Sequence, residues 1–344
     1  MSSAGTDIII PVWNMPTETR DCLATLVEHS PDVRLILLDT GSDQATEQLL
    51  QEFADFLDSR ALLLRSESAH GYVATVNRGL AKASAPLVVV MRSTSRVTPG
   101  WLESFQEAAL RPDAGILVPR LELSGTAPFR TKKPKCCAVE ALCGSFSALG
   151  ITRNLYGAVG GFDEGLDGDL WCLKDYSRRA ERSGFRTLRL AGPPILYREP
   201  TRYGSPERRE KNLLKSIATY TERWGKEQVF CSILSPDIDQ EAVGKACNSM
   251  LAAARRGHHF FVFAPPSVYR MILSASLHTL HDNIQLHKLP SFYPFRACRS
   301  AIARLRDTYR NICVLTGLDG LLDLEGEKGV TFAEFEKSIS PVEV

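Results

Sequence analysis

Short apolar segments alternate with amphipathic segments near the start of the chain, and this alternation most constrains the fold. The apolar segments read "DIIIPVWN", "VRLILLDTGS", "ALLLRSE" and "PLVVVM". Three helical patterns separate them: "TETRDCLATLVEH", with Thr17 as a candidate N-cap, "QATEQLLQEFADFL" and "YVATVNRGLAKAS". Strands that alternate with helices through short linkers are typical of a doubly wound, mostly parallel sheet. We therefore predict an α/β fold for this part of the chain.

A polar segment follows each predicted strand. These segments read "PVWN", "DTGS", "RSESAHG" and "RSTSR". In open parallel sheets, ligands bind beyond the carboxyl ends of the strands, near the point where the strand order reverses. The four segments are therefore expected to line one crevice.

The chain of 344 residues is long enough for two domains. After Gly225, the strand-like segments "VFCSIL", "HFFVFAPP", "IQLHKLP" and "NICVLTG" alternate with three helical stretches. We predict a first domain at residues 1–225 and a second, smaller α/β domain at residues 226–344. The second domain has no Gly-rich phosphate loop, so its role is open, and it is a candidate surface for a protein partner.

Charge and hydropathy exclude several classes of protein. The 41 basic and 40 acidic residues leave a net charge of +1, which argues against whole-surface binding to nucleic acid. No apolar run approaches the length of a transmembrane segment, and the first residues lack the pattern of a signal peptide. The nine cysteines contain no C-x-x-C pair and favour buried thiols in a reducing compartment. We expect a cytoplasmic protein.

The order of motifs in the first domain resembles the family 2 glycosyltransferases, which have the GT-A fold. The motifs are "DIIIPVWN", "LILLDTGSDQAT", "HGYVATVNRGLAKAS", "VTPGWLESF" and "GSFSALGITRNLYGAVGGFDEGL". The resemblance spans residues 7–224 and implies transfer of a sugar from a nucleotide-sugar donor. The acceptor that it implies is a glycan, a lipid carrier or a protein.

The resemblance and the strand ends together suggest a set of residues for binding the nucleotide-sugar. Asp39, at the end of a strand, is placed to accept hydrogen bonds from a base or ribose. Trp13 either stacks on the base or packs in its loop, and Asn14 and Asn77 either bind the donor or cap backbone groups. The full set is Pro11, Trp13, Asn14, Asp39, Gly71, Asn77, Arg92, Thr94 and Arg198.

The sequence departs from the family at the metal motif. The two acids of that motif fall on "RSTS", which places Thr94 on the key acid and Arg92 two residues before it. Mg²⁺ and Mn²⁺ prefer carboxylate oxygens, and a neutral hydroxyl beside arginines is a poor substitute. We therefore predict no metal site and no cofactor, with the nucleotide-sugar as a substrate.

A second departure affects the catalytic base. The acidic pair that carries the base in the family falls on Trp171 and Cys172, or on Cys172 and Leu173. An inverting transfer needs a base within reach of the acceptor hydroxyl. The nearby Asp169 and Asp175 are the candidates, and the alternative for both is a solvated or helix-capping carboxylate.

The histidine that often follows in the family falls on Arg198 or Glu199. Arginine presents a planar fork that suits phosphate oxygens, so Arg92, Arg96 and Arg198 could together neutralise a diphosphate. Two hypotheses remain open. The first is a metal-independent glycosyltransferase, and the second is an inactive GT-A domain that serves as a binding or scaffold subunit in glycan or cell-surface assembly. The arginine-rich stretch at residues 198–211 is a candidate for contact with acidic lipid or a phosphorylated carrier.

Overall fold

The structure of the protein, a computed structural model, divides into two compact units. It describes residues 5–66, 71–125, 138–166, 169–198, 205–309, 311–316, 321–324 and 329–339. The first unit comprises residues 1–138 and 143–225, and the second comprises residues 139–142 and 226–344.

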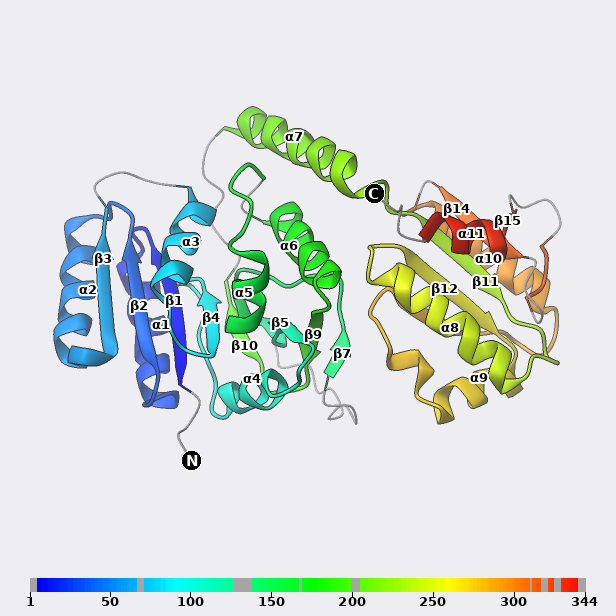
Figure 1. Cartoon of the computed structure of the whole chain (residues 1–344), viewed down its shortest axis with the longest axis horizontal. Helices are drawn as coiled ribbons and strands as arrows, with labels where there is room; N and C mark the ends of the chain where they lie inside the picture. Colours follow the sequence, from blue (N-terminus) through cyan, green and yellow to red (C-terminus); the bar gives the residue numbers. More distant parts are fainter. Residues whose placement is uncertain are drawn as a thin grey trace. The chain divides into compact units, whose positions relative to one another are not determined.

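The first unit is built on a twisted sheet whose centre is parallel (Figure 1). Seven of its strands follow the order β3-β2-β1-β4-β8-β5-β9. β1 pairs in parallel with both β2 and β4, whereas β8 runs antiparallel to β4 and β5. The bounds are β1 (Thr6–Val12), β2 (Arg34–Asp39), β3 (Ala61–Arg65), β4 (Leu87–Met91), β5 (Ala114–Val118), β8 (Ala148–Thr152) and β9 (Arg186–Leu190). The predicted doubly wound α/β fold is confirmed.

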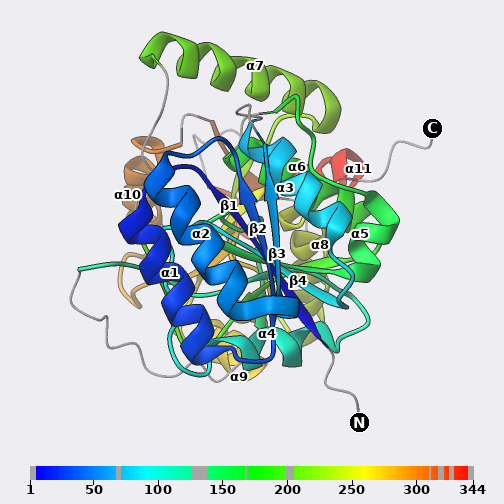
Figure 2. The same cartoon turned by 90° about the vertical axis from the view of Figure 1, so that its left-hand side faces the viewer.

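Helices cover both faces of this sheet, and Figure 2 shows α1 and α2 on one side and α3 and α5 on the other. The first core lies beneath α1 (Pro16–His29), α2 (Gln44–Leu57) and α4 (Trp101–Ala109). The second lies beneath α3 (Tyr72–Lys82), α5 (Arg153–Val159) and α6 (Leu170–Arg182). The remaining elements are η1 (Asp58–Arg60), the parallel pair β6 (Leu121–Leu123) and β10 (Ile195–Tyr197), and α7 (Pro206–Trp224).

The helix starts follow local chemistry. The Asp43 side chain caps α2 by accepting from the Thr46 amide at 2.8 Å, as expected of an N-cap aspartate. The prediction of Thr17 as the cap of α1 is wrong, because Pro16 already occupies the first turn. Proline is favoured there, since its fixed φ suits a helix and its missing N–H has no partner to lose.

An ion pair at the start of β1 joins three segments of the first unit. The buried Asp7 carboxylate accepts from Arg34 at 2.9 and 2.7 Å, and from the amides of Ser84 and Ala85 at 2.7 and 3.0 Å. Burial alone raises the pKa of Asp7, but these hydrogen bonds lower it in net below its ordinary value. The charged carboxylate thereby holds β1 and β2 to the turn before β4.

The second unit is a smaller parallel sheet in the order β13-β12-β11-β14-β15. Its strands are β11 (Val229–Ile233), β12 (His259–Ala264), β13 (Ile284–Lys288), β14 (Ile312–Thr316) and β15 (Gly329–Thr331). One core involves α8 (Gln240–Ala254), α9 (Pro266–Ser274) and α11 (Phe332–Ile339), the other involves α10 (Pro294–Arg306), and η2 (Leu277–Thr279) precedes β13.

A short piece of the preceding chain belongs to this second unit, although the sequence prediction placed it in the first. Residues 139–142 include the end of β7 (Ala138–Glu140). Glu140 accepts two hydrogen bonds from Arg255, both at 2.6 Å, and bridges to His281. No local pattern in the sequence signals this long-range pairing, and residues 126–137, with "RTKKPKCC", lie outside the described residues.

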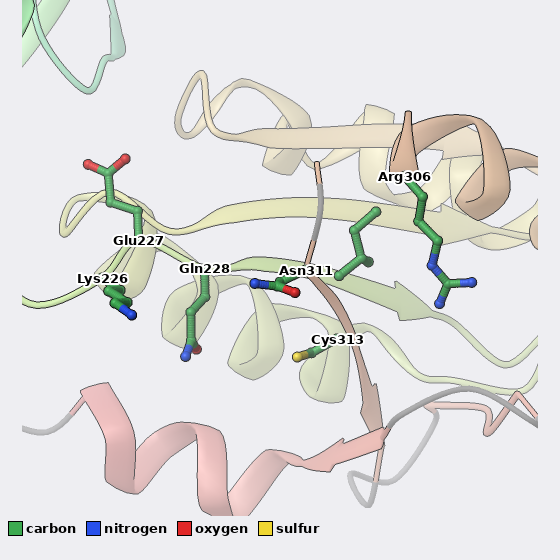
Figure 3. Close-up of a pocket in the computed structure, with 7 residues that line it drawn as sticks. Lys226, Glu227, Gln228, Arg306, Asn311 and Cys313 are labelled. Carbon is green, nitrogen blue, oxygen red and sulfur yellow. The ribbon is translucent and has the colours of Figure 1, made fainter. Parts of the chain in front are cut away.

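A cavity of about 410 Å³ opens at the amino edge of the second sheet (Figure 3). Its lining comes from the segments before β11 and at the start of β14, with Arg306 from the end of α10. The lining residues are Lys226, Glu227, Gln228, Arg306, Asn311, Ile312 and Cys313. Ligands of open parallel sheets usually bind at the opposite, carboxyl edge, so we assign no role to this cavity.

The seven cysteines within the described residues form no disulfide, and five of them are buried. This agrees with the expectation of small apolar side chains in the core. Among the described helices, none is both long and apolar enough to cross a bilayer.

Gly150 tests the packing of the first sheet. A Cβ atom at this position would lie 2.8 Å from Phe105 Cδ1 and 2.9 Å from Leu117 Cβ. We expect Gly150→Ala to lower the free energy of unfolding by about 1–3 kcal/mol, because neither neighbour can move without disturbing the core.

The matched control is Gly157→Ala in α5, where a Cβ would meet nothing within 4 Å. That change should leave stability unchanged or raise it by about 0.5–1 kcal/mol. Urea unfolding followed by tryptophan fluorescence suits both, because the four tryptophans of the chain all lie in the first unit. Equal effects of the two substitutions would contradict the packing of Gly150.

Candidate functional site

The strand order places the candidate site at the carboxyl ends of β1, β2 and β4. Strand order reverses beside β1, which has β2 on one side and β4 on the other. Such a reversal leaves a crevice between the loops that follow the two central strands. Trp13 follows β1, Asp39 ends β2, and Arg92 follows β4 directly. Three of the four predicted polar segments thus lie at one edge, and the fourth lies partly outside the described residues.

The charges of Arg92 and Asp169 both act on Tyr72, the first residue of α3. The Arg92 guanidinium carbon lies 4.8 Å from the centroid of the Tyr72 ring, which is a cation–π distance. Burial raises the pKa of Tyr72 to about 12, with a lowering contribution from Arg92 and a raising contribution from Asp169. The phenol is therefore neutral at pH 7 and lies within electrostatic range of both charges.

Two hydroxyl groups of this cluster are buried without a hydrogen-bond partner among the described residues. They are the phenol of Tyr72 and the Oγ1 of Thr94. A buried polar group without a partner is costly, and in native proteins such groups call for an explanation. Both hydroxyls can donate to or accept from a ligand that enters the crevice.

The loop after β1 is tied to the loop after β2. The Asn14 backbone N–H donates to Ser42 Oγ at 2.9 Å, and the Asp43 N–H donates to Asn14 Oδ1 at 2.7 Å. Asn14 therefore caps backbone groups, which is one of its two predicted roles. Pro11 is buried in β1, beyond its last pairing with β4 at Ile9. Its missing N–H consequently costs no hydrogen bond to β4.

The side chains of Trp13 and Asp39 differ in solvent exposure. Trp13 is 39% exposed at the mouth of β1, where its ring can stack on a planar ligand. Asp39 is buried; one carboxylate oxygen accepts from the Ser42 N–H at 3.0 Å, and the other lies 4.0 Å from Arg65 Nε. A nucleoside contact of Asp39 thus stays a prediction, and it requires the second oxygen.

The three arginines of the predicted cluster do not act as one group. Arg198 donates to Glu18 at 3.0 Å, and Arg96 lies 3.9 Å from Asp21, so both pair with acids of α1. Their backbones come together where Arg96 bridges antiparallel to Leu196. Arg92 is the member of the trio that lies against Tyr72.

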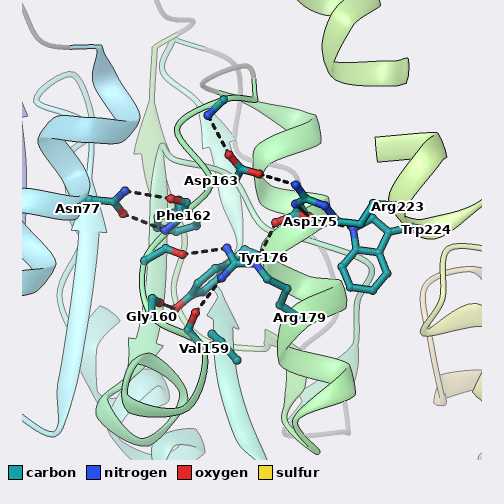
Figure 4. Close-up of polar contacts among 12 residues, drawn as sticks. Asn77, Val159, Gly160, Phe162, Asp163, Asp175, Tyr176, Arg179, Arg223 and Trp224 are labelled. Atoms are coloured by element: carbon teal, nitrogen blue, oxygen red, sulfur yellow. Dashed lines mark hydrogen bonds and ion pairs between the residues drawn. The ribbon is translucent and has the colours of Figure 1, made fainter. Parts of the chain in front are cut away.

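Both the nitrogen and the oxygen of the Asn77 side-chain amide form hydrogen bonds within the protein. Its amide nitrogen donates to the Phe162 carbonyl at 3.0 Å and to Glu164 at 2.8 Å, and its oxygen accepts from the Phe162 N–H at 2.8 Å (Figure 4). A Cβ at the neighbouring Gly161 would lie 2.5 Å from this oxygen, so only glycine fits there. This clamp favours the backbone role predicted for Asn77. Gly71 precedes α3 as its exposed N-cap residue.

Asp175 is the centre of a polar network, with no exposed surface (Figure 4). It accepts from Arg179 Nε at 2.9 Å, Arg223 Nη1 at 2.6 Å and Trp224 Nε1 at 2.9 Å. Arg223 also donates to Asp163 at 2.9 Å. Three donors leave this carboxylate little capacity to take a proton from an acceptor, so its contacts favour a structural role in joining α6 to α7.

Packing residues occupy the positions on which the acidic pair of the family falls. The ring of Trp171 lies 5.0 Å from that of Tyr220 in α7, and Lys174 Nζ lies 4.8 Å from the Trp171 ring. Cys172 is fully buried in the second core. Asp169 is exposed at the start of α6, and its side chain makes no capping hydrogen bond. Asp169 is therefore accessible to a ligand at the start of α6.

Comparison with known proteins agrees with this geometry. Residues 7–160 match the model of the family described as glycosyl transferase family 2. The matched residues make up less than half of the chain. No protein in a search of curated sequences matches the chain.

A solved structure of a glycosyltransferase shares the fold. GalNAc-T7, solved with UDP, GalNAc and Mn²⁺, aligns with a TM-score of 0.53 at 14% identity over 64% of this chain and 48% of its own. The chain thus spans about half the length of that enzyme. The mannosyltransferase PcManGT of Pyrobaculum calidifontis, solved with GDP-Man and Mn²⁺, aligns with a TM-score of 0.48 at 15% identity over 88% of this chain and 80% of its own.

The residues directly after β4 offer no carboxylate to a divalent cation. They offer hydroxyl groups, among them that of Thr94, and the neighbouring helix adds the phenol of Tyr72. The Arg92 guanidinium beside them repels a cation. Mn²⁺ and Mg²⁺ favour carboxylate oxygens, and among the described residues no cluster of three or more histidine, cysteine, aspartate or glutamate side chains is suited to a metal.

Tyr72 was not among the residues expected at the site, although it stands in "HGYVATVN" beside the predicted Gly71. Its aromatic ring at helical spacing reads as core, and part of it does pack against Phe146 at 5.1 Å. Arg223 and Trp224 were also missed as partners of Asp175. A buried carboxylate generally requires such donors. The sequence does not show which residues supply them, because Arg223 and Trp224 lie far from α6 along the chain.

The Asp175 network yields a stability prediction for the first unit. Asp175→Asn removes the charge that two arginines face, and we expect the free energy of unfolding to fall by about 3–5 kcal/mol. Asp169→Asn is the matched control on the same helix; it is exposed and should change stability by no more than about 0.5 kcal/mol. Urea unfolding followed by tryptophan fluorescence measures both, and a small effect of Asp175→Asn would refute the structural role.

Proposed function

We propose that the first unit transfers a sugar from a nucleotide-sugar donor, with the charge of the leaving diphosphate neutralised by Arg92 rather than by a metal. The observation that carries this proposal is the cluster of Arg92, Tyr72 and Thr94 at the carboxyl edge of β4, in a family 2 glycosyltransferase domain. It combines a fixed cation with two hydroxyls that lack partners.

The geometry supports Arg92 as a phosphate ligand. Its guanidinium carbon lies 4.8 Å from the centroid of the Tyr72 ring, and this cation–π contact restricts the side chain before any ligand arrives. A preorganised arginine loses less freedom on binding and can donate two hydrogen bonds to phosphate oxygens. Thr94 and Tyr72 can add neutral hydrogen bonds to the same group. Arg198, already paired with Glu18, would play a smaller part.

The transfer would be a direct displacement. The acceptor oxygen forms a bond to the anomeric carbon, the bond from that carbon to the diphosphate oxygen breaks, and the nucleoside diphosphate leaves with the bonding electrons. The acceptor proton goes to a base, for which Asp169 is the exposed candidate near Tyr72. The acceptor would be a glycan, a lipid carrier or a protein.

A second function is favoured by the residues of α6. Trp171 and Cys172 pack where the family resemblance expects acids, and Asp175 is occupied by three donors. If Asp169 does not act as a base, the domain would bind a nucleotide-sugar or a partner without turnover, as a scaffold subunit in glycan assembly.

Calorimetric titration with UDP-, GDP-, CMP- and TDP-sugars tests the binding site. We expect one nucleotide to bind equally well with Mn²⁺ and with a chelator. Arg92→Ala should weaken that binding about 10- to 100-fold, because it removes charge-assisted hydrogen bonds to phosphate.

The control for this titration is Arg20→Ala, an exposed arginine of α1 on the same unit, which should bind as the wild type does. Binding that requires Mn²⁺ would refute the arginine model. Absence of binding by every nucleotide would refute the transferase proposal and leave the scaffold.

Donor hydrolysis and transfer test the base. With the nucleotide identified by titration, Asp169→Asn should leave its affinity unchanged and lower the rate about 10²- to 10⁴-fold, as expected for loss of a general base. Asp55→Asn, an exposed aspartate of α2, is the control and should keep the full rate. If Asp169→Asn retains the wild-type rate, Asp169 is not the base, and a wild type that binds donor without turnover supports the inactive domain.

A further inference from the structure

Three large aromatic side chains are exposed together where α10 begins in the second unit. Phe292 is 82% exposed, Tyr293 78% and Phe295 46%, and we call these three residues the aromatic tip. Only Pro294 interrupts them. Tyr293 has a φ of +53°, a left-handed conformation that bulky residues rarely adopt. Exposed apolar clusters and strained residues both mark sites of interaction.

The aromatic tip is not a part of the core that has turned outward. Helix α10 already uses its apolar face, with Cys298 and Ile302 fully buried in the core beneath it. The three rings lie outside that core among the exposed large hydrophobic residues. Their exposure therefore needs a partner outside the second unit's own fold.

The segment that carries the aromatic tip is strongly cationic. Between Ile284 and Arg306 the sequence has five lysine or arginine residues and no aspartate or glutamate, in a chain whose net charge is +1. All five cations are exposed: Lys288, Arg296, Arg299, Arg304 and Arg306. Arg296 and Arg299 lie one turn apart in α10, and Phe295 and Arg299 are i, i+4 neighbours, so cations and rings share one side of the helix.

Aromatic rings beside a band of cations match the chemistry of an anionic bilayer surface. Aromatic side chains favour the level of the lipid headgroups, where their apolar bodies leave water and their polar edges stay hydrated. Lysine and arginine are attracted to anionic headgroups over a Debye length. A single-stranded nucleic acid would instead require rings spaced along a basic groove, whereas these three rings are packed into four consecutive positions.

We propose that the aromatic tip and the cations of α10 dock the second unit onto a membrane surface that carries anionic lipid. The rings insert among the headgroups, and Lys288, Arg296 and Arg299 lie against the lipid phosphates. The contact is peripheral. It lies entirely in the second unit and does not depend on sugar transfer by the first.

Flotation of the full-length protein with vesicles tests this proposal. We expect the protein to float with vesicles of phosphatidylcholine and phosphatidylglycerol at low salt, to release at high salt, and to ignore vesicles of phosphatidylcholine alone. Replacing the aromatic tip with serines, as Phe292→Ser, Tyr293→Ser and Phe295→Ser together, should lower the partition coefficient about tenfold or more. Arg296→Gln with Arg299→Gln should lower it about 30-fold, the effect of two cations near an anionic surface.

Two matched variants in the first unit control for nonspecific adsorption through exposed aromatic rings and through positive charge. Phe56→Ser removes an aromatic ring that is 70% exposed on α2. Arg78→Gln with Lys82→Gln removes two exposed cations of α3. Both should float as the wild type does. Circular dichroism of every variant checks that the fold is retained.

Several outcomes would overturn the proposal. The wild type could fail to bind the anionic vesicles, or bind neutral vesicles as well as it binds the anionic ones. The tip and arginine variants could float as the wild type does. Light scattering could show a dimer that the tip variant converts to a monomer without any vesicle binding, which would make the tip a contact between copies. Tight binding to a single-stranded oligonucleotide in place of vesicles would assign the surface to nucleic acid.

Discussion

The parallel pairing of β1 with two neighbours is the constraint on which the rest of the first unit depends. Because β1 is buried and hydrogen-bonded to β2 and β4, all three strands end at the same edge of the sheet. The helices must then return over opposite faces, which opens the crevice at that edge. The ion pair of Asp7 with Arg34 holds the other ends of these strands together. The site is thus a consequence of strand order before any side chain at it is considered.

Within this frame, charged groups divide into those that hold the fold and those that face the crevice. Asp175 satisfies two arginines and an indole, and Asn77 satisfies the backbone of Phe162. These contacts fix α3, α6 and α7 relative to the loop between them. Arg92 differs because it lies over the aromatic ring of Tyr72. A cation held by a ring keeps more of its capacity for an anionic ligand than one held by an acid.

The two units share an architecture but differ in their surfaces. Both are open sheets with helices on two faces, but the second has a cationic segment and exposed aromatic rings at α10 where the first has polar loops. Apolar rings in water lose hydrophobic stabilisation, so a surface of this kind is retained at a cost to solubility. The positive charge of this surface is confined to one segment, so the net charge of the whole chain, which is close to zero, does not reveal it.

Sequence alone determined the class of the fold, because hydrophobic periodicity and turn residues act over a few positions and survive without tertiary information. It also determined which loops meet at the carboxyl edge, and that Thr94 stands where the resemblance expects an acid. The tertiary structure decided what each polar side chain contacts. It placed Arg223, 48 residues further along the chain, against Asp175 and paired Arg198 with Glu18. It also paired Glu140 with Arg255 of the second unit, and set Arg92 over the ring of Tyr72. These pairings join residues far apart in the chain, and their energies depend on burial and orientation, which no local pattern encodes.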